Sequence, residues 1–242
     1  MSFVKDSVNK QPIVDNVFTI VSKAKQAIAE YGNDAVVNAT IGSLYGEDGK
    51  LVALDTVYDS LKNLDNRSMA AYAASFTGNP DFKEQVYDWV LNGNSHLNHE
   101  VIATPGGTGA VDMPVSYCLD PGQTLVLPSL AWGSYNLMAQ MNNLKTVKYD
   151  LFEEDHFNLN SFKKACLSAM EVQDRLVVII NDPCHNPSGY SLSKEEWNEV
   201  IAFLNECSKT HSVVLLNDIA YIDFSYQQEK AKEYMNCFDS IS

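Results

Sequence analysis

The stretch RLVVIINDPCHNPSGY, residues 175–190, decides the fold. Its five apolar residues Leu176–Ile180 lead directly into an Asn-Asp-Pro turn. A short continuous apolar run between turn formers is typical of a strand that is buried on both faces of a parallel sheet. In open α/β folds, ligands bind just past the carboxyl ends of such strands. We therefore expect the polar tip at His185, Asn186 and Pro187 to lie at a binding site.

Strand and helix patterns alternate from Val101 onward. The strand candidates are residues 101–104, 124–128, 146–150, 175–180 and 213–218, and helical patterns cover 109–119, 133–141, 160–172 and 193–210. The last helix opens with Ser193 and, three residues later, Glu196, which together form a capping box. Strands separated by helices of this length predict a three-layer α/β/α fold with a mostly parallel sheet.

The part of the chain before residue 101 is organised differently. Helical periodicity covers residues 14–31, 56–64 and 81–91, and residues 36–51 have the pattern of a short strand, a glycine loop and a turn. Organisation changes near residue 50. The pattern therefore predicts a separate, smaller unit over residues 1–50 and a large domain over residues 51–242.

Composition excludes several classes of protein. The net charge is −14, from 31 acidic and 17 basic residues, which argues against nucleic acid and anionic membranes as partners. The five cysteines form no C-x-x-C pair, so neither a zinc site nor a disulfide framework is indicated. The first residues carry no apolar signal core, and no run reaches membrane-spanning length. We expect a cytoplasmic protein with reduced thiols.

Two motifs follow the first strand candidates. In TPGGTGAVDM, residues 104–113, the main-chain N–H groups of an opening helix and the Thr108 hydroxyl could bind an anion. The glycine spacing matches neither the dinucleotide nor the Walker pattern, so a tight turn without a ligand is the alternative. In LPSLAWGSY, residues 127–135, Trp132 could stack on a flat ligand, or it could simply cap the core.

Two further motifs follow the later strands. Asn186 offers an amide donor for a developing oxyanion, and the Asn186-Pro187 bond is a candidate cis peptide, although a plain turn is the alternative. His185 could act as a general base or only support the loop. Asp218 ends a buried strand, where a carboxylate needs a cation or several donors unless it caps a helix. Tyr221 follows it.

All four motifs come at the ends of successive strand candidates and so share one edge of one sheet. An anion cradle, a flat aromatic ring, an amide donor and a buried carboxylate together describe a site for a phosphorylated aromatic heterocycle. Pyridoxal 5′-phosphate is a ligand of this type. The agreement between the four motifs is stronger support than any one of them.

Four motifs of the chain resemble those of the fold-type I pyridoxal-phosphate aminotransferases. They are GGTGA at residues 106–110, Trp132 with Gly133, HNPSG at residues 185–189 and NDIAY at residues 217–221. Their order and spacing over about half the chain resemble the aspartate and aromatic amino-acid branch. The resemblance implies an aminotransferase whose substrates are an amino acid and a 2-oxo acid. It further implies a homodimer with shared active sites. Residues 1–50 would be the N-terminal arm and the start of the small domain, and residues 51–242 the pyridoxal-phosphate-binding large domain, incomplete at its C-terminal end.

The resemblance also implies roles for single residues. The residues that it assigns to the cofactor are Gly106, Gly107, Thr108, Trp132, Asn186, Asp218, Tyr221 and Tyr72. The glycines and Thr108 would bind the phosphate, and Asp218 would pair with the pyridine nitrogen. Tyr72 would reach the phosphate of the partner subunit, and Gly42 would lie near the substrate carboxylate.

The resemblance implies a catalytic Lys, which forms the Schiff base, roughly 35 residues after Asp218. That position lies beyond Ser242, so we expect no catalytic residue in this chain and interpret it as the N-terminal portion of an aminotransferase. A lyase, decarboxylase or synthase of the same fold is an alternative, because fold does not fix function. A non-catalytic binding module that retains the fold is another. A dinucleotide-binding oxidoreductase is disfavoured by the glycine spacing.

Overall fold

The computed structural model describes residues 3–4, 12, 16–91, 97–225 and 233–242. The chain divides into two compact units, one formed by Lys10–Tyr72 and the other by Met1–Asn9 together with Ala73–Ser242. This division falls after Tyr72. The predicted domains over residues 1–50 and 51–242 stay a prediction.

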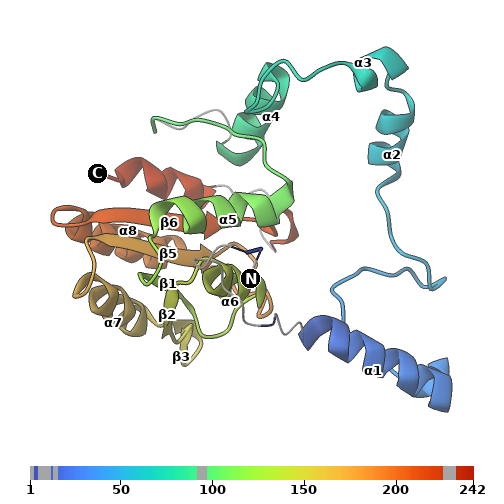
Figure 1. Ribbon diagram of the computed structural model, residues 1–242, viewed down its shortest axis with the longest axis horizontal. Coiled ribbons are helices and arrows are strands. Elements are labelled where there is room, and N and C mark those ends of the chain that lie inside the picture. The colour runs from blue at the N-terminus through green and yellow to red at the C-terminus, as the bar shows by residue number, and fades with distance from the viewer. Residues whose placement is uncertain (1–2, 5–11, 13–15, 92–96, 226–232) are drawn as a thin grey trace. The chain divides into compact units, whose positions relative to one another are not determined.

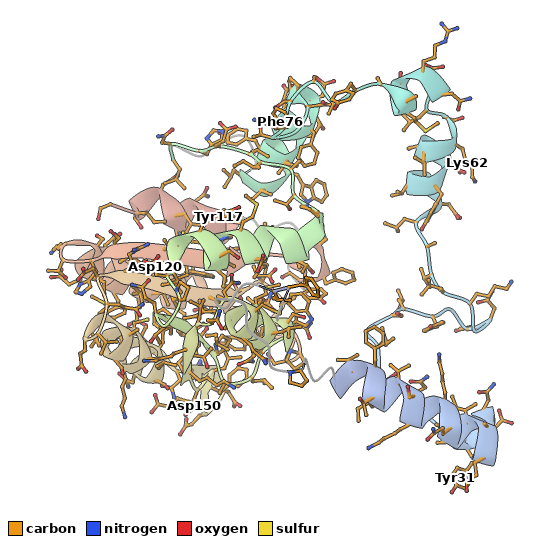
Figure 2. All side chains as sticks on the ribbon, in the orientation of Figure 1. Tyr31, Lys62, Phe76, Tyr117, Asp120 and Asp150 are labelled. Atoms are coloured by element: carbon orange, nitrogen blue, oxygen red, sulfur yellow. The ribbon has the colours of Figure 1, made fainter. Side chains whose placement is uncertain are left out.

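Among its described residues, the smaller unit is built from helices. They are α1 (Asn16–Tyr31), η1 (Asn33–Ala35), α2 (Asp55–Lys62) and α3 (Asn66–Ala70). None of its described residues is buried, and Figure 2 draws Tyr31 and Lys62 with their side chains pointing away from their helices. The short strand expected within residues 36–51 was wrong. An isolated bridge between Tyr45 and Leu51 forms there, and one bridge does not make a strand ladder.

The larger unit alternates helices and strands (Figure 1). Its elements up to the second strand are α4 (Pro80–Leu91), α5 (Gly106–Cys118), β1 (Thr124–Pro128), α6 (Ser134–Met141) and β2 (Lys145–Tyr149). A hairpin of β3 (Phe152–Glu153) and β4 (His156–Phe157) precedes α7 (Leu159–Met170). The remaining elements are β5 (Arg175–Asn181), α8 (Lys194–Ser208), β6 (Ser212–Asp218), η2 (Ile222–Phe224) and η3 (Glu233–Ser240).

Four parallel strands form the central sheet in the order β2-β1-β5-β6. From β1 the chain moves outward to β2, and it then crosses back to β5 and moves outward to β6 on the other side. The direction of winding therefore changes between β1 and β5. Such a switch point leaves a crevice at the carboxyl ends of the strands, and ligands of open α/β sheets bind there.

The side chains of the central strands form two separate cores, one on each face of the sheet, because successive side chains of a strand point to opposite faces. Val126 and Val178 belong to the apolar cluster that α7, α8 and η3 contribute to. Leu125 and Ile179 belong to the cluster on the other face, with α5 and α6. The run Leu176–Ile180 is apolar throughout because both of its faces are covered. With α7 and α8 on one face of the sheet and α5 and α6 on the other, the predicted three-layer α/β/α fold is confirmed.

Two local predictions ahead of β1 need correction. Residues 101–104 form no strand; Ala103 N donates to Thr77 O, in a loop rather than a ladder, and Ile102 is 47% exposed. Without a partner strand or burial, an apolar pattern alone does not hold an extended segment. In addition, α5 begins at Gly106 rather than at Gly109. Its first turn therefore contains Gly107 and Thr108.

Candidate active site

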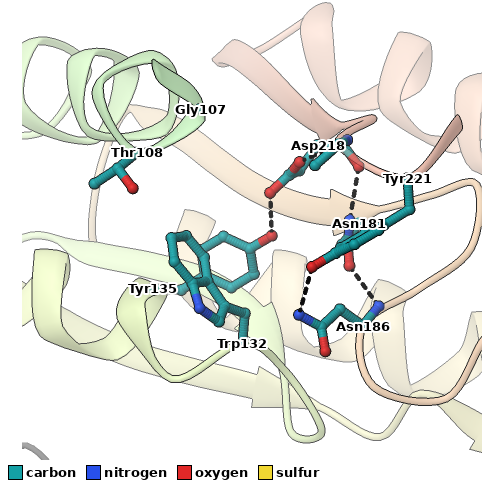
Figure 3. Close-up of a pocket in the computed structure, with 9 residues that line it drawn as sticks. Gly107, Thr108, Trp132, Tyr135, Asn181, Asn186, Asp218 and Tyr221 are labelled. Atoms are coloured by element: carbon teal, nitrogen blue, oxygen red, sulfur yellow. Dashed lines mark hydrogen bonds between the residues drawn. The ribbon is translucent and has the colours of Figure 1, made fainter. Parts of the chain in front are cut away.

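A pocket of about 230 Å³ lies at the carboxyl end of the sheet. Figure 3 shows its residues converging from the first turn of α5, the segment after β1, the end of β5 and the end of β6. The residues that line it are Gly107, Thr108, Trp132, Tyr135, Asn181, Asn186, Asp218, Ala220 and Tyr221. The pocket therefore occupies the crevice at the switch point between β1 and β5.

Asp218 presents its carboxylate on the wall of this pocket from the last position of β6. Its Oδ2 accepts a hydrogen bond of 2.5 Å from the Tyr135 hydroxyl, and its Oδ1 accepts one of 3.1 Å from Ala220 N. Burial and the bond to Asp218 raise the pKa of Tyr135 well above its usual range, so the phenol stays a donor at neutral pH. The carboxylate is thus held by two neutral donors.

Asn186 lies opposite Asp218, and a chain of hydrogen bonds joins the two. The main-chain N of Asn186 donates to Asn181 Oδ1 at 2.7 Å, and Asn181 Nδ2 donates to the Asp218 carbonyl at 2.8 Å. Asn186 Nδ2 donates to the Tyr221 hydroxyl at 3.2 Å, as Figure 3 shows. The Asn186-Pro187 bond is cis, as predicted.

His185 supports this loop from beneath and does not line the pocket. It is 2% exposed, its Nε2 lies 3.0 Å from the Leu130 carbonyl, and its Nδ1 lies 2.8 Å from the Ser188 hydroxyl. A carbonyl only accepts, so Nε2 carries the proton and Nδ1 accepts from Ser188. Burial lowers the pKa of His185, which favours this neutral form. The ring therefore ties the Asn186 loop to the segment that carries Trp132.

Comparison with known proteins identifies the family. Residues 34–240 match the family model described as aminotransferase class I and II. The chain belongs to this family. An aminotransferase from Anaerococcus prevotii has a crystal structure with a TM-score of 0.91 and 33% identity, over 100% of this chain and 60% of that one. An aromatic-amino-acid aminotransferase from Burkholderia pseudomallei, covalently bound to pyridoxal phosphate, has the same fold at a TM-score of 0.72 and 22% identity, over 98% and 58% of the two chains.

Curated relatives agree with this assignment. An aspartate aminotransferase of Musicola paradisiaca is 27% identical over 162 residues, which are 65% of this chain and 38% of the relative. One of Salmonella typhi is 25% identical over 211 residues, 85% of this chain and 52% of the relative. The chain thus spans about half the length or less of these aminotransferases. The predicted resemblance to the aspartate and aromatic branch of aminotransferases is confirmed at the level of the family.

Most of the residues that the aminotransferase motifs singled out meet in this pocket. Those that line it are Gly107, Thr108, Trp132, Asn186, Asp218 and Tyr221. Gly106, with a φ of 69°, opens α5 and is not among the lining residues. Gly42 and Tyr72 lie in the smaller unit. The roles of all nine residues, and a catalytic Lys beyond Ser242, stay predictions.

Sequence reasoning missed Tyr135, Asn181 and Ala220, which also line the pocket. Tyr135 follows Trp132 by three residues, and the two rings meet edge to face with their centroids 5.5 Å apart. A buried tyrosine needs a hydrogen-bond partner for its hydroxyl, so its position beside a strand end was the available signal. Asn181 directly follows the apolar run and opens the Asn-Asp-Pro turn, so its place at the strand end was visible in the sequence.

The arrangement can hold a flat ligand with an anionic tail. Main-chain N–H groups in the first turn of α5 and the Thr108 hydroxyl favour an anion at one end. The Asp218 carboxylate favours a protonated ring nitrogen, and Asn186 can donate to a ring oxygen. Trp132 offers an aromatic face between them. The donor set therefore fits pyridoxal phosphate.

Proposed function

We propose that this chain provides the cofactor-binding part of a pyridoxal-phosphate-dependent aminotransferase, which transfers an amino group between an amino acid and a 2-oxo acid. The observation that carries the proposal is the convergence of Asp218, Asn186 and Tyr221 on one pocket beside the first turn of α5. Membership of the aminotransferase family supports the reaction class.

The residues of the pocket would hold the cofactor through complementary groups. Asp218 would keep a proton on the pyridine nitrogen, since an adjacent carboxylate raises the pKa of a basic nitrogen. Asn186 Nδ2 and the Tyr221 hydroxyl would donate to the phenolic oxygen. Tyr221 accepts the bond from Asn186, so its own hydrogen is available for this purpose. Pyridoxal phosphate supplies an electron sink when a Cα proton leaves, and a protonated ring strengthens it.

The phosphate would bind at the first turn of α5. Gly107 would bring its main-chain N–H close to the phosphate oxygens, and the Thr108 hydroxyl would add a side-chain donor. The 13-residue helix orients its dipole so that negative charge is favoured at this end. Trp132 would lie against the face of the ring and exclude water from it.

Titration of the chain with pyridoxal 5′-phosphate tests this proposal, with quenching of tryptophan fluorescence as the readout. We expect saturable binding, and we expect Asp218→Ala to raise the Kd at least tenfold, which corresponds to about 1.4 kcal/mol. Asp223→Ala is the matched control, because Asp223 is exposed and does not line the pocket. No saturable binding, or equal affinities for both variants, would contradict the proposal.

The reaction itself needs a separate test on the intact gene product. Incubation with candidate amino acids, with and without a 2-oxo acid, should yield a new amino acid only when the acceptor is present. Product that forms without an acceptor would instead indicate elimination or decarboxylation by the same fold.

We further propose a cytoplasmic homodimer in which Tyr72 reaches the phosphate of the partner subunit. The resemblance to the family supports the dimer, and the sequence composition supports the location. Among the residues that the structure describes, no helix combines the length and apolar character needed to cross a membrane. Light scattering should give twice the mass of one chain, and Tyr72→Phe should weaken cofactor binding only in the dimer. A monomer that binds the cofactor with full affinity would rule out the shared site, and cell fractionation tests the location.

A further inference from the structure

A fully buried carboxyl group lies at the base of the loop that carries Asn186. Asp182 follows β5 directly, and its exposed fraction is 0%. Its Oδ1 accepts a hydrogen bond of 2.7 Å from Leu192 N, and its Oδ2 accepts one of 2.8 Å from the Trp197 indole Nε1. A buried carboxylate is costly unless donors of this kind satisfy it. The Asp182 carboxyl does not line the pocket and makes none of the proposed cofactor contacts, so it is available for another role.

These two bonds close the loop of residues 183–191. Asp182 precedes the loop and Leu192 follows it, so the bond between them joins its two ends. The bond to Trp197 fixes the same carboxylate to α8. Inside the loop, His185 N donates to Tyr190 O at 2.8 Å. The loop therefore behaves as a closed ring with Asn186 on the side that faces the pocket.

We propose that Asp182 is a positioning residue for the pocket: its ionised carboxylate clamps the base of the 183–191 loop and thereby fixes where Asn186 presents its amide. The consequence for ligand binding rests on the proposed function, whereas the clamp itself does not. Asn186 is joined to β5 on the other side as well, through Asn181 Oδ1, so the clamp acts on the side of the loop toward α8.

The clamp depends on the charge of Asp182. A carboxylate accepts from both donors at once, but a protonated carboxyl presents an O–H where one of the donors approaches, and one bond is lost. Burial raises the pKa of Asp182 to about 7, while the bonds from Leu192 and Trp197 act in the opposite direction. Protonation near neutral pH should therefore loosen the loop.

The titratable groups around Asp182 do not change charge in the same range. Glu196 of α8 adds to the rise in the pKa of Asp182. Partial burial acts to raise the pKa of Glu196 itself, but the hydrogen bonds from Ser193, Tyr190 and Phe157 together lower it, so Glu196 stays ionised. Tyr149 of β2, Tyr190 of the loop and Tyr234 of η3 have raised pKa values, chiefly through burial, and stay neutral. Burial lowers the pKa of His185 in the same loop, so its ring stays neutral near pH 7. Asp182 is therefore the group of this cluster that titrates near pH 7.

Nuclear magnetic resonance of the ¹⁵N-labelled chain tests the clamp without a ligand. The side-chain amide signal of Asn186, assigned by its loss in Asn186→Gln, should shift with pH around a midpoint near 7. Asp182→Asn should abolish this midpoint, and Trp197→Phe, which removes a donor to the carboxylate, should move it to higher pH. Asp150→Asn is the control and should leave it unchanged, because Asp150 is exposed. A signal that does not respond to pH, or an unchanged midpoint in Asp182→Asn, would overturn the proposal.

Pyridoxal 5′-phosphate provides the second readout. If only the ionised form presents Asn186 correctly, the Kd should rise about tenfold more between pH 8 and pH 6 in the parent chain than in Asp182→Asn. The titration of the phosphate is common to both proteins and cancels in this comparison. Absence of binding at every pH would contradict the proposed function, and the amide signal would still decide the role of Asp182. If Asp182→Asn does not fold by circular dichroism, the midpoint of Trp197→Phe decides it: a shift upward supports the clamp, and no shift overturns it.

Discussion

Removing the Tyr135 hydroxyl gives a sharp test of how the pocket holds its carboxylate. Tyr135→Phe deletes the 2.5 Å hydrogen bond to Asp218 Oδ2 and leaves the ring in place. The ring is 1% exposed and keeps its edge-to-face contact with Trp132, so no cavity opens. A hydrogen bond to a charged group contributes about 1.5–3 kcal/mol. Because Asp218 lines an open pocket, water can replace the lost donor, and we expect the lower end, about 1.5 kcal/mol.

Urea unfolding followed by circular dichroism measures this change in the free energy of unfolding. With an urea slope of about 1–3 kcal/mol per molar, the midpoint should fall by roughly 0.5–1.5 M. Tyr117→Phe is the matched control, because Tyr117 is 80% exposed on α5, and its effect should stay within about 0.5 kcal/mol. A loss below about 0.5 kcal/mol for Tyr135→Phe would refute the reasoning, since the bond would then contribute no more than an exposed hydroxyl.

Three other changes have expected outcomes that the same unfolding assay checks. Ile179→Ala should cost about 2–5 kcal/mol, because Ile179 is fully buried, whereas Val172→Ala at 75% exposure should cost under about 0.5 kcal/mol; similar losses would contradict the two-core packing. Ser193→Ala should cost about 0.5–2 kcal/mol by removing the capping box of α8, and no loss would show that the cap is dispensable. Burial lowers the pKa of His185, so at this residue the unfolded chain binds more protons, and the contribution of His185 to stability falls as the pH drops below about 6.5. His185→Gln should reduce that loss, and an equal loss in both proteins would contradict it.

The sequence predicted those parts of the fold in which a local pattern of apolar and polar residues matches a single kind of element. The five apolar residues of Leu176–Ile180, bounded by turn formers, predicted a strand buried on both faces, and Asp218 and Asn186 come at the ends of strands that share one edge of the sheet. Residues 101–104 show the opposite case, because their apolar pattern is the same but no strand accepts them. Pairing is a property of the assembled sheet, so local composition did not reveal it.

The parts of the site that escaped prediction depend on distant partners. Tyr135 contacts a carboxylate 83 residues later in the chain; its position beside a strand end indicates the edge of the sheet but does not identify that partner. Asp182 reads in the sequence as an ordinary Asp-Pro turn; only the fold shows that it is fully buried beneath Trp197. The types of residue that form the pocket could be inferred from motifs, whereas the supports beneath it required the structure.

The last rung of the ladder between β5 and β6 pairs Asn181 with Asp218. Asn181 and Asp218 both line the pocket, and main-chain hydrogen bonds of the sheet set the distance between them. These bonds are the same whatever side chains fill the cores on either face. Substitutions in those cores can change how tightly the helices pack while the distance between Asn181 and Asp218 is preserved. Such an arrangement lets the sequence of the core change without moving the residues that contact the ligand. It gives a physical reason why an aminotransferase that shares a third of its residues with this chain has the same fold.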